Sequence, residues 1–152
     1  MEIERKWLLN EIPNLPVLEH GHIEQFYLSM KPEVRVRRYV ALVGKGYPQY
    51  RLTVKGEGSL SREEMECEIP ENFYQKALRM VNKCPIFKDY WVFDLEGKHL
   101  EVSAVEDKFI YAEIEFPTTE EAEAYSLPLA DATDITYDSR YKMKKYWKQT
   151  RL

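Results

Sequence analysis

The chain lacks long apolar runs and carries no excess of positive charge. No segment approaches the roughly 18 uninterrupted apolar residues that a membrane-spanning helix needs, and residues 1–10 lack the apolar run of a signal peptide. The 22 basic and 26 acidic residues give a formal charge of -4, so the global basic field typical of nucleic-acid-binding proteins is missing. We therefore expect a cytoplasmic protein that binds neither a membrane nor nucleic acid, and any anion site must be local.

Cysteine and glycine are also scarce. Cys67 and Cys84 fit no metal-ligand spacing and cannot form a disulfide framework, which favours a reducing compartment. With only 6 glycines and 44% hydrophobic residues, the chain has enough apolar material for a core and no segment of disordered composition. At this length, residues 1–152 are expected to form a single domain.

Alternation of apolar and polar residues dominates the chain, and this period of two is typical of strands. It predicts eight strands, at residues 1–9, 22–30, 33–43, 49–55, 62–69, 86–93, 98–105 and 109–116. Glycine-containing turns suited to antiparallel hairpins separate several of them, at residues 44–46, 56–58 and 96–98. The sheet is therefore expected to be mostly a meander.

Three helices are expected between or after these strands. One follows Pro70 and turns apolar residues to one face, namely Phe73, Ala77 and Met80 or Val81. A second follows Thr118, which forms a capping box with Glu121, and a third is expected from Asp138. Strands and helices combined in this way predict an α+β domain built around an antiparallel sheet or barrel.

Charged residues recur two positions apart on strand after strand, a spacing that places their side chains on one face. These sets are Glu2, Glu4 and Lys6; Arg35 and Arg37; Thr53 and Lys55; Arg62, Glu64 and Glu66; and Glu113 and Glu115. The apolar residues between them are expected to pack on the opposite face, namely Ile3, Val34, Val36, Leu52, Val54, Met65, Cys67 and Ile114.

The charged face has two interpretations. Strands that are half exposed usually turn their polar residues to water. If the strands close into a barrel instead, its interior has room for side chains or one small ligand. A polyanion with divalent cations suits such a lining, because Mg²⁺ takes carboxylate and phosphate oxygens while Arg and Lys contact phosphate. The pattern alone does not decide between the two.

The first residues, Glu2-Ile3-Glu4-Arg5-Lys6, resemble the Glu-x-Glu-x-Lys signature of the CYTH family, the triphosphate tunnel metalloenzymes that include class IV adenylate cyclases and thiamine triphosphatase. Similar segments follow in family order over nearly the whole chain, at residues 25–29, 35–37, 52–56, 61–66, 112–115 and 136–141. Short motifs in the right order, on predicted strands of the right phase, argue against coincidence.

The resemblance implies an eight-stranded antiparallel β-barrel with a few flanking helices, and hydrolysis of a triphosphate with Mg²⁺ or Mn²⁺. It implies metal ligands at Glu2, Glu4, Glu113 and Glu115, with Glu2, Glu4 and Lys6 as catalytic residues. It implies triphosphate contacts at Lys6, Arg35, Arg37, Lys55, Arg62, Lys88 and Arg140, and further tunnel carboxylates at Glu64 and Glu66. The substrate is a small molecule: inorganic tripolyphosphate, thiamine triphosphate or a nucleoside triphosphate. A homodimer is compatible with the sequence.

Three positions depart from the family pattern. Tyr90 stands where many members have an arginine, and Ser103 where an acidic residue is usual, although Glu101 lies two residues away on the same face. Phe26 replaces a glycine and would either narrow the tunnel mouth or fill a bulge. Reduced activity is therefore expected. Two alternatives stay open, a class IV adenylate cyclase-type activity on ATP and a non-catalytic polyphosphate- or nucleotide-binding domain.

The remaining basic residues of the C-terminal segment are typical of a solvated helix face, whose cations lie favourably near the helix C-terminus. They are Lys142, Lys144, Lys145, Lys148 and Arg151. Only Arg140 is assigned a role, through the closing motif of the family.

Overall fold

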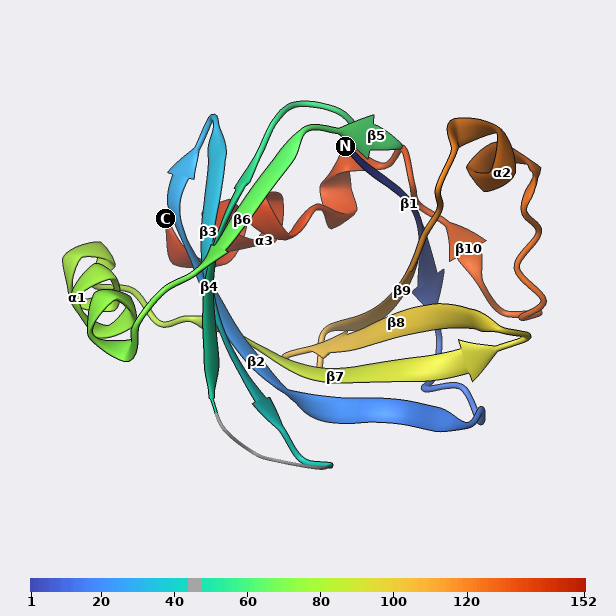
Figure 1. Cartoon of the computed structure of the whole chain (residues 1–152), viewed down its shortest axis with the longest axis horizontal. Coiled ribbons are helices and arrows are strands. Elements are labelled where there is room, and N and C mark those ends of the chain that lie inside the picture. Colours follow the sequence, from blue (N-terminus) through green and yellow to red (C-terminus); the bar gives the residue numbers. More distant parts are fainter. Residues whose placement is uncertain (44–47) are drawn as a thin grey trace.

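The computed structural model describes residues 1–43 and 48–152 of the chain. Its strands form one antiparallel sheet that curls into a nearly closed barrel, in the order β10-β1-β9-β8-β7-β2-β3-β4-β6, with β5 paired to β1 (Figure 1). The predicted α+β class and antiparallel barrel are confirmed. The turn expected at residues 44–46 lies outside the described residues.

Eight longer strands account for the barrel wall: β1 (Glu2–Leu9), β2 (Val17–Met30), β3 (Glu33–Ala41), β4 (Gln49–Lys55), β6 (Glu64–Glu68), β7 (Ile86–Leu95), β8 (Lys98–Val105) and β9 (Phe109–Glu115). Two further strands are only two residues long, β5 (Ser61–Arg62) and β10 (Thr133–Asp134). The single strand expected at residues 62–69 is therefore divided between β5, which pairs with β1, and β6, which pairs with β4.

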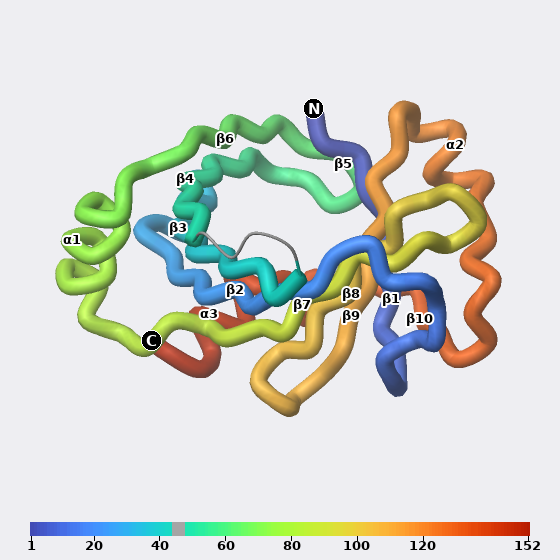
Figure 2. The backbone as a smooth tube through the Cα atoms, turned by 60° about the horizontal axis from the view of Figure 1, so that its bottom comes forward, coloured from blue at the N-terminus to red at the C-terminus, as the bar shows by residue number. Residues whose placement is uncertain are grey.

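Two meanders make up the sheet, β2-β3-β4-β6 and β7-β8-β9, and the pairing of β2 with β7 joins them. In Figure 2 the strands surround a common centre, with β6 and β5 on one side and β7, β8 and β9 on the other. The β7–β8 hairpin turns at Glu96 and Gly97, both of which have positive φ, 52° and 85°. This geometry is that of the two-residue turns whose twist suits a hairpin.

The helices are α1 (Glu71–Val81), α2 (Thr119–Ala124) and α3 (Met143–Arg151), with a 3-10 turn η1 (Ser139–Tyr141) before α3. The Thr118 hydroxyl accepts a hydrogen bond from the Glu121 N–H at 3.1 Å, as the capping motif predicts. No helix among the described residues is both long and apolar enough to cross a bilayer.

Two helix predictions need correction. The third helix begins at Met143 and not at Asp138, because Lys142 has an extended backbone (ψ 134°) and Asp138 caps only the short η1 turn. In α1 the buried residues are Tyr74 and Ala77, whereas Phe73 is 41% and Met80 83% exposed. Ala77 and Val81 pack as predicted, whereas Tyr74 takes the place expected for Phe73 and Met80 faces solvent.

The apolar core lies outside the barrel wall, between the strands and the segments that cover them. One cluster is centred on Trp7, Phe93, Leu100, Val102 and Ile114 beside α2, and a second on Phe26, Val36, Tyr74, Ile86 and Trp147 beneath α1 and α3. Val36 and Ile114 thus pack as predicted. Met65 and Cys67 do not: both are exposed on β6, which lies at one end of the sheet order.

Trp147 holds α3 against the barrel wall, and its removal should be costly. Its side chain is 1% exposed, with its ring 6.0 Å from that of Tyr27. Trp147→Ala is expected to lower the free energy of unfolding by about 3–5 kcal/mol, because a large buried aromatic leaves a cavity. Urea denaturation measures the loss. The exposed Lys148→Ala on the same helix should change it by less than about 0.5 kcal/mol, and an equal loss would contradict the packing role.

Candidate active site

A cavity of about 600 Å³ occupies the interior of the barrel, and alternate residues of the strands line it. Most residues implied by the family resemblance meet there, although they come from distant parts of the chain. They are Glu2, Glu4, Lys6, Arg35, Arg37, Lys55, Arg62, Glu64, Glu66, Glu113 and Glu115. The charged face of the strands therefore points inward among the described residues, and the apolar face packs outward.

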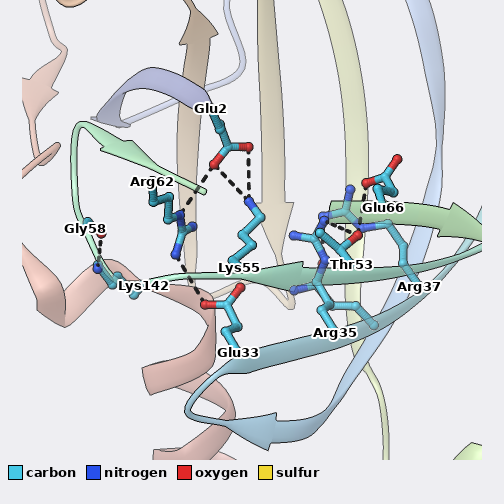
Figure 3. Close-up of polar contacts among 11 residues, drawn as sticks. Glu2, Glu33, Arg35, Arg37, Thr53, Lys55, Gly58, Arg62, Glu66 and Lys142 are labelled. Carbon is cyan, nitrogen blue, oxygen red and sulfur yellow. Dashed lines mark hydrogen bonds and ion pairs between the residues drawn. The ribbon is translucent and has the colours of Figure 1, made fainter. Parts of the chain in front are cut away.

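One end of the cavity is organised around Glu2 (Figure 3). Its carboxylate accepts hydrogen bonds from Lys55 Nζ at 3.2 Å and from Arg62 Nε at 3.4 Å, and Arg62 Nη1 also reaches Glu33 at 3.4 Å. Burial by itself raises the pKa of Glu2, but the Lys55 ammonium and a hydrogen bond with Glu64 outweigh it and hold that pKa below its usual value. Both signs of charge are thus present in this half-closed space.

Glu64, on β6, lies beside this group and behaves differently. It pairs with Lys55 in the β4–β6 ladder. Burial first, and then its hydrogen bond with Glu2, raise the pKa of Glu64 to about 7. Where two carboxylates share a proton in this way, a bound cation could take the place of the proton.

Arg35 and Arg37 project from β3 toward the same cavity and are only partly satisfied. Arg35 Nη2 lies 3.5 Å from the Thr53 hydroxyl, and Arg37 Nη2 donates to Gln25 Oε1 at 3.1 Å. The Nε atoms of both arginines are buried and have no hydrogen-bond partner among the described residues. Buried guanidinium groups with free donors are costly unless an anion pairs with them. They are therefore candidates for binding an anion.

A carboxylate row lies on the opposite wall, where β1, β9 and β8 are neighbours. Glu4 is directly opposite Glu115, and Glu113 is between Lys6 on β1 and Glu101 on β8. Carboxylates placed directly opposite each other destabilise a sheet unless a cation compensates them. A bound cation or a shared proton would therefore relieve the repulsion between these carboxylates.

Glu4 and Glu113 are linked by a hydrogen bond, and their pKa values move apart. Burial by itself raises the pKa of Glu113, but the Lys6 ammonium and the bond with Glu4 lower it to about 2. Burial and the charge of Glu113 raise the pKa of Glu4 well above its usual value. In this arrangement no three carboxylate, imidazole or thiolate groups of residues 1–43 and 48–152 converge closely enough to hold a metal ion.

Two lysines lie deeper in the wall. Lys6 Nζ donates to the Tyr141 carbonyl at 2.6 Å and lies 4.1 Å from the centre of the Tyr111 ring. Lys88 is 3% exposed and donates from Nζ to the Tyr111 hydroxyl at 2.9 Å, so it lies behind the cavity lining. Burial lowers the pKa of Lys6, and burial with the charges of Arg37 and Arg35 lowers the pKa of Lys88 further.

The structure does not bring Arg140 into the cavity. Its side chain is 75% exposed and forms an ion pair with Asp138 at 2.7 Å. Asp138 lines the cavity, and Arg140 contacts it while remaining exposed to solvent. The backbone turn η1 points the two side chains toward each other, which local sequence alone does not reveal.

Five charged residues of the described cavity lining have no role in the sequence-based prediction: Glu19, Glu33, Arg51, Asp138 and Lys142. Lys142 is predicted to lie on a solvated face, but it lines the cavity and its Nζ donates to the Gly58 carbonyl at 2.8 Å. Its extended backbone, just before α3, places it there. Glu33 also lines the cavity, and its position two residues before Arg35 could have revealed it. Arg151 is not solvated either, because Glu106 binds it at 2.6 Å.

The three departures from the family pattern have distinct places. Tyr90 and Glu101 line the cavity, and the Tyr90 hydroxyl donates to Glu101 Oε1 at 2.6 Å. Ser103 is 4% exposed and lies opposite Tyr111 in the β8–β9 ladder. Phe26 neither narrows the tunnel nor fills a bulge. It is fully buried in the outer core, with its ring 5.3 Å from that of Tyr74.

Comparisons with known proteins support the fold, although no family model matches the chain. An inorganic triphosphatase of Nitrosomonas europaea is 28% identical over 159 residues, and the match covers 94% of both chains. Two solved structures, of the hypothetical protein NE1496 and of the inorganic triphosphatase NE1496, align with TM-scores of 0.64 and 0.63 at 25% and 24% identity. They cover 96% of this chain, and 97% and 93% of their own.

A conserved hypothetical protein from Pyrococcus furiosus aligns with a TM-score of 0.56 at 23% identity, over 81% of this chain and 84% of that one. The likeness between these proteins therefore extends over most of the barrel. The chain is similar, over nearly its whole length, to an inorganic triphosphatase and shares its fold.

Proposed function

We propose that the chain is a metal-dependent triphosphatase of the CYTH type, which hydrolyses a triphosphate inside the barrel. The observation that carries the proposal is the two-sided lining of the cavity. Cations come from β3, β4 and β5, those of β3 with a buried donor that has no partner among the described residues, and a row of facing carboxylates comes from β1, β8 and β9. The similarity to an inorganic triphosphatase favours inorganic tripolyphosphate as substrate, ahead of thiamine triphosphate and nucleoside triphosphates.

The basic side would bind the phosphate chain. Arg35 and Arg37 can each direct a planar fork of donors to phosphate oxygens, which the compact ammonium of a lysine cannot do. Lys55 and Arg62 continue the same basic side toward Glu2. An entering triphosphate would compete with Glu2 and Glu33 for these two cations, and so release the carboxylates.

The carboxylate side fits Mg²⁺ or Mn²⁺, because these hard ions take oxygen ligands from carboxylates and phosphates. No three such groups converge among the described residues, so one or two of the carboxylates Glu2, Glu4, Glu113 and Glu115 would hold the ion, and phosphate oxygens would complete its coordination. Glu101, beside Glu113, is a further carboxylate where Ser103 replaces the acidic residue of the family. When bound, such an ion polarises a phosphoryl oxygen and activates a water molecule. Lys6, opposite Glu113, would stabilise negative charge on the phosphoryl group.

A phosphate-release assay tests the proposal. Tripolyphosphate, thiamine triphosphate and ATP are each incubated with Mg²⁺, with Mn²⁺ and with a chelator in place of metal. We expect phosphate from tripolyphosphate only when a divalent cation is present. Undiminished hydrolysis in the chelator would contradict the metal-dependent mechanism.

A non-catalytic polyphosphate-binding domain is the second candidate, and Tyr90 favours it. Tyr90 occupies the cavity wall where an arginine would add positive charge, and binding tolerates such a loss better than turnover does. The two candidates differ in one measurement: the binding domain would raise the melting temperature with tripolyphosphate and metal but release no phosphate. Formation of cyclic AMP from ATP in the same assay would instead support the cyclase alternative.

A further inference from the structure

Two tyrosines and two glutamates form a wall on one side of the cavity, here called the tyrosine wall: Glu19, Tyr39, Tyr90 and Glu101. The Tyr39 hydroxyl donates to Glu19 and the Tyr90 hydroxyl to Glu101. The two rings meet edge to face, with centroids 5.8 Å apart and planes at 86°. Each side chain is therefore held by a hydrogen bond to its glutamate and by contact with the other ring.

The tyrosine wall separates two spaces. Three of its members, Glu19, Tyr90 and Glu101, line both the barrel cavity and a second cavity of about 580 Å³. Glu115 lines both as well, whereas Val92 and His99 line only the second. A chain molecule that extends from the barrel cavity in this direction would have to pass the rings of Tyr90 and Tyr39.

The charge changes sign at this wall. Arg37 is the cation on its inner side, and its charge acts on both Tyr90 and Glu101. Beyond Arg37 the tyrosine wall presents the carboxylates Glu19 and Glu101. Glu115 lies in the lining of both cavities, and Lys98 lines the second. A phosphate held by Arg37 is attracted, but a further phosphate in the same chain would meet aromatic rings and negative charge.

We propose that the tyrosine wall limits the length of the phosphate chain, so that the cavity accepts triphosphate and rejects longer linear polyphosphates at the Arg37 end. The inference rests on the proposed function, because it assigns Tyr90 and Tyr39 a role in the specificity of the same site. The role is steric and electrostatic, and neither tyrosine takes part in bond cleavage.

The test compares affinities, so it does not depend on turnover. Isothermal titration calorimetry in the presence of a chelator, where no hydrolysis is expected, measures the affinity for tripolyphosphate and for tetrapolyphosphate in each variant. Tyr90→Ala opens the wall and is expected to raise the tetrapolyphosphate affinity relative to tripolyphosphate by about tenfold or more. Tyr90→Phe keeps the ring and should keep the wild-type discrimination. Phe87→Ala, exposed on the same strand, should also leave the ratio unchanged.

An unchanged affinity ratio in folded Tyr90→Ala overturns the inference, as does an equal change in Phe87→Ala or Tyr90→Phe. Tyr39→Ala removes the second ring and tests the same wall if Tyr90→Ala fails to fold, which its melting curve reports. If the wild-type protein binds neither polyphosphate, the proposed function itself fails. If it binds tripolyphosphate and the ratio stays constant in both alanine variants, only the wall is refuted.

Discussion

Replacing Glu113 with Gln is expected to reduce triphosphate turnover about a thousandfold while the protein stays folded. Glu113 lies between Lys6 and Glu101 in the sheet and accepts a hydrogen bond from Glu4, so it is central to the proposed cation site. Loss of one charged ligand weakens the binding of the metal ion that stabilises negative charge in the transition state. Removing a group that stabilises such charge often lowers the rate by two to three orders of magnitude.

The fold should survive because Glu4 can take over the charge of Glu113. At present burial and the Glu113 carboxylate raise the pKa of Glu4. In the Gln variant this repulsion is gone, so Glu4 ionises more readily and pairs with Lys6. The glutamine amide also keeps the volume and hydrogen-bonding capacity of the original side chain.

The measurement is phosphate release from tripolyphosphate across a Mg²⁺ titration, with circular dichroism and a melting curve to check folding. Glu63→Gln is the matched control, because Glu63 is exposed and lies outside the cavity lining. Both variants lose one negative charge. If the Glu113 variant is folded and as active as the control, Glu113 does not hold the metal.

Arg37→Ala should weaken triphosphate binding by about 10- to 100-fold. Its side chain lines the cavity and donates from Nη2 to Gln25, so the other N–H groups at the tip of its guanidinium are the donors for a phosphate. Charge-assisted hydrogen bonds contribute about 1.5–3 kcal/mol each, and every 1.4 kcal/mol is a factor of ten in affinity. The loss should appear in the tripolyphosphate dissociation constant measured by calorimetry.

Two control variants separate the site from diffuse surface charge. Arg38→Ala removes the same charge one residue along β3, where the side chain turns to the outer face and lies 3.9 Å from Glu24. Lys145→Ala removes an exposed charge near the start of α3. Both should change the affinity by less than about threefold. Equal losses in all three variants would show that the cavity is not the binding site.

Much of the barrel could be predicted from the sequence, because the alternation of polar and apolar residues that marks each strand is a local pattern. The period of two identified every long strand, and the predicted limits of β8, Lys98–Val105, agree with the structure. The same period placed the side chains of Arg35 and Arg37 on one face, and that face lines the cavity. Glu33 follows the same rule and was overlooked only because no family motif marked it.

Predictions failed where a side chain depends on a neighbour that is distant in the chain. Lys142 reaches Gly58 across 84 residues, and Met65 is exposed because β6 ends the sheet order. The packed face of α1 is set by contacts such as the hydrogen bond from Tyr74 to Glu24 on β2, at 3.0 Å. The apolar pattern of the helix is too broad to choose between Phe73 and Tyr74.

The sequence by itself determined the strands, the charged face of each strand and the order of the motifs along the chain. Only the tertiary structure decided that this face points inward. The alternation of polar and apolar residues is the same whether the polar face of a strand is turned to water or to the interior of a barrel. The difference arises from pairing between distant strands, β1 with β9 and β2 with β7, which closes the sheet. Closure also forms the ion pair of Glu2 with Lys55, 53 residues apart, and encloses both in the cavity of the barrel.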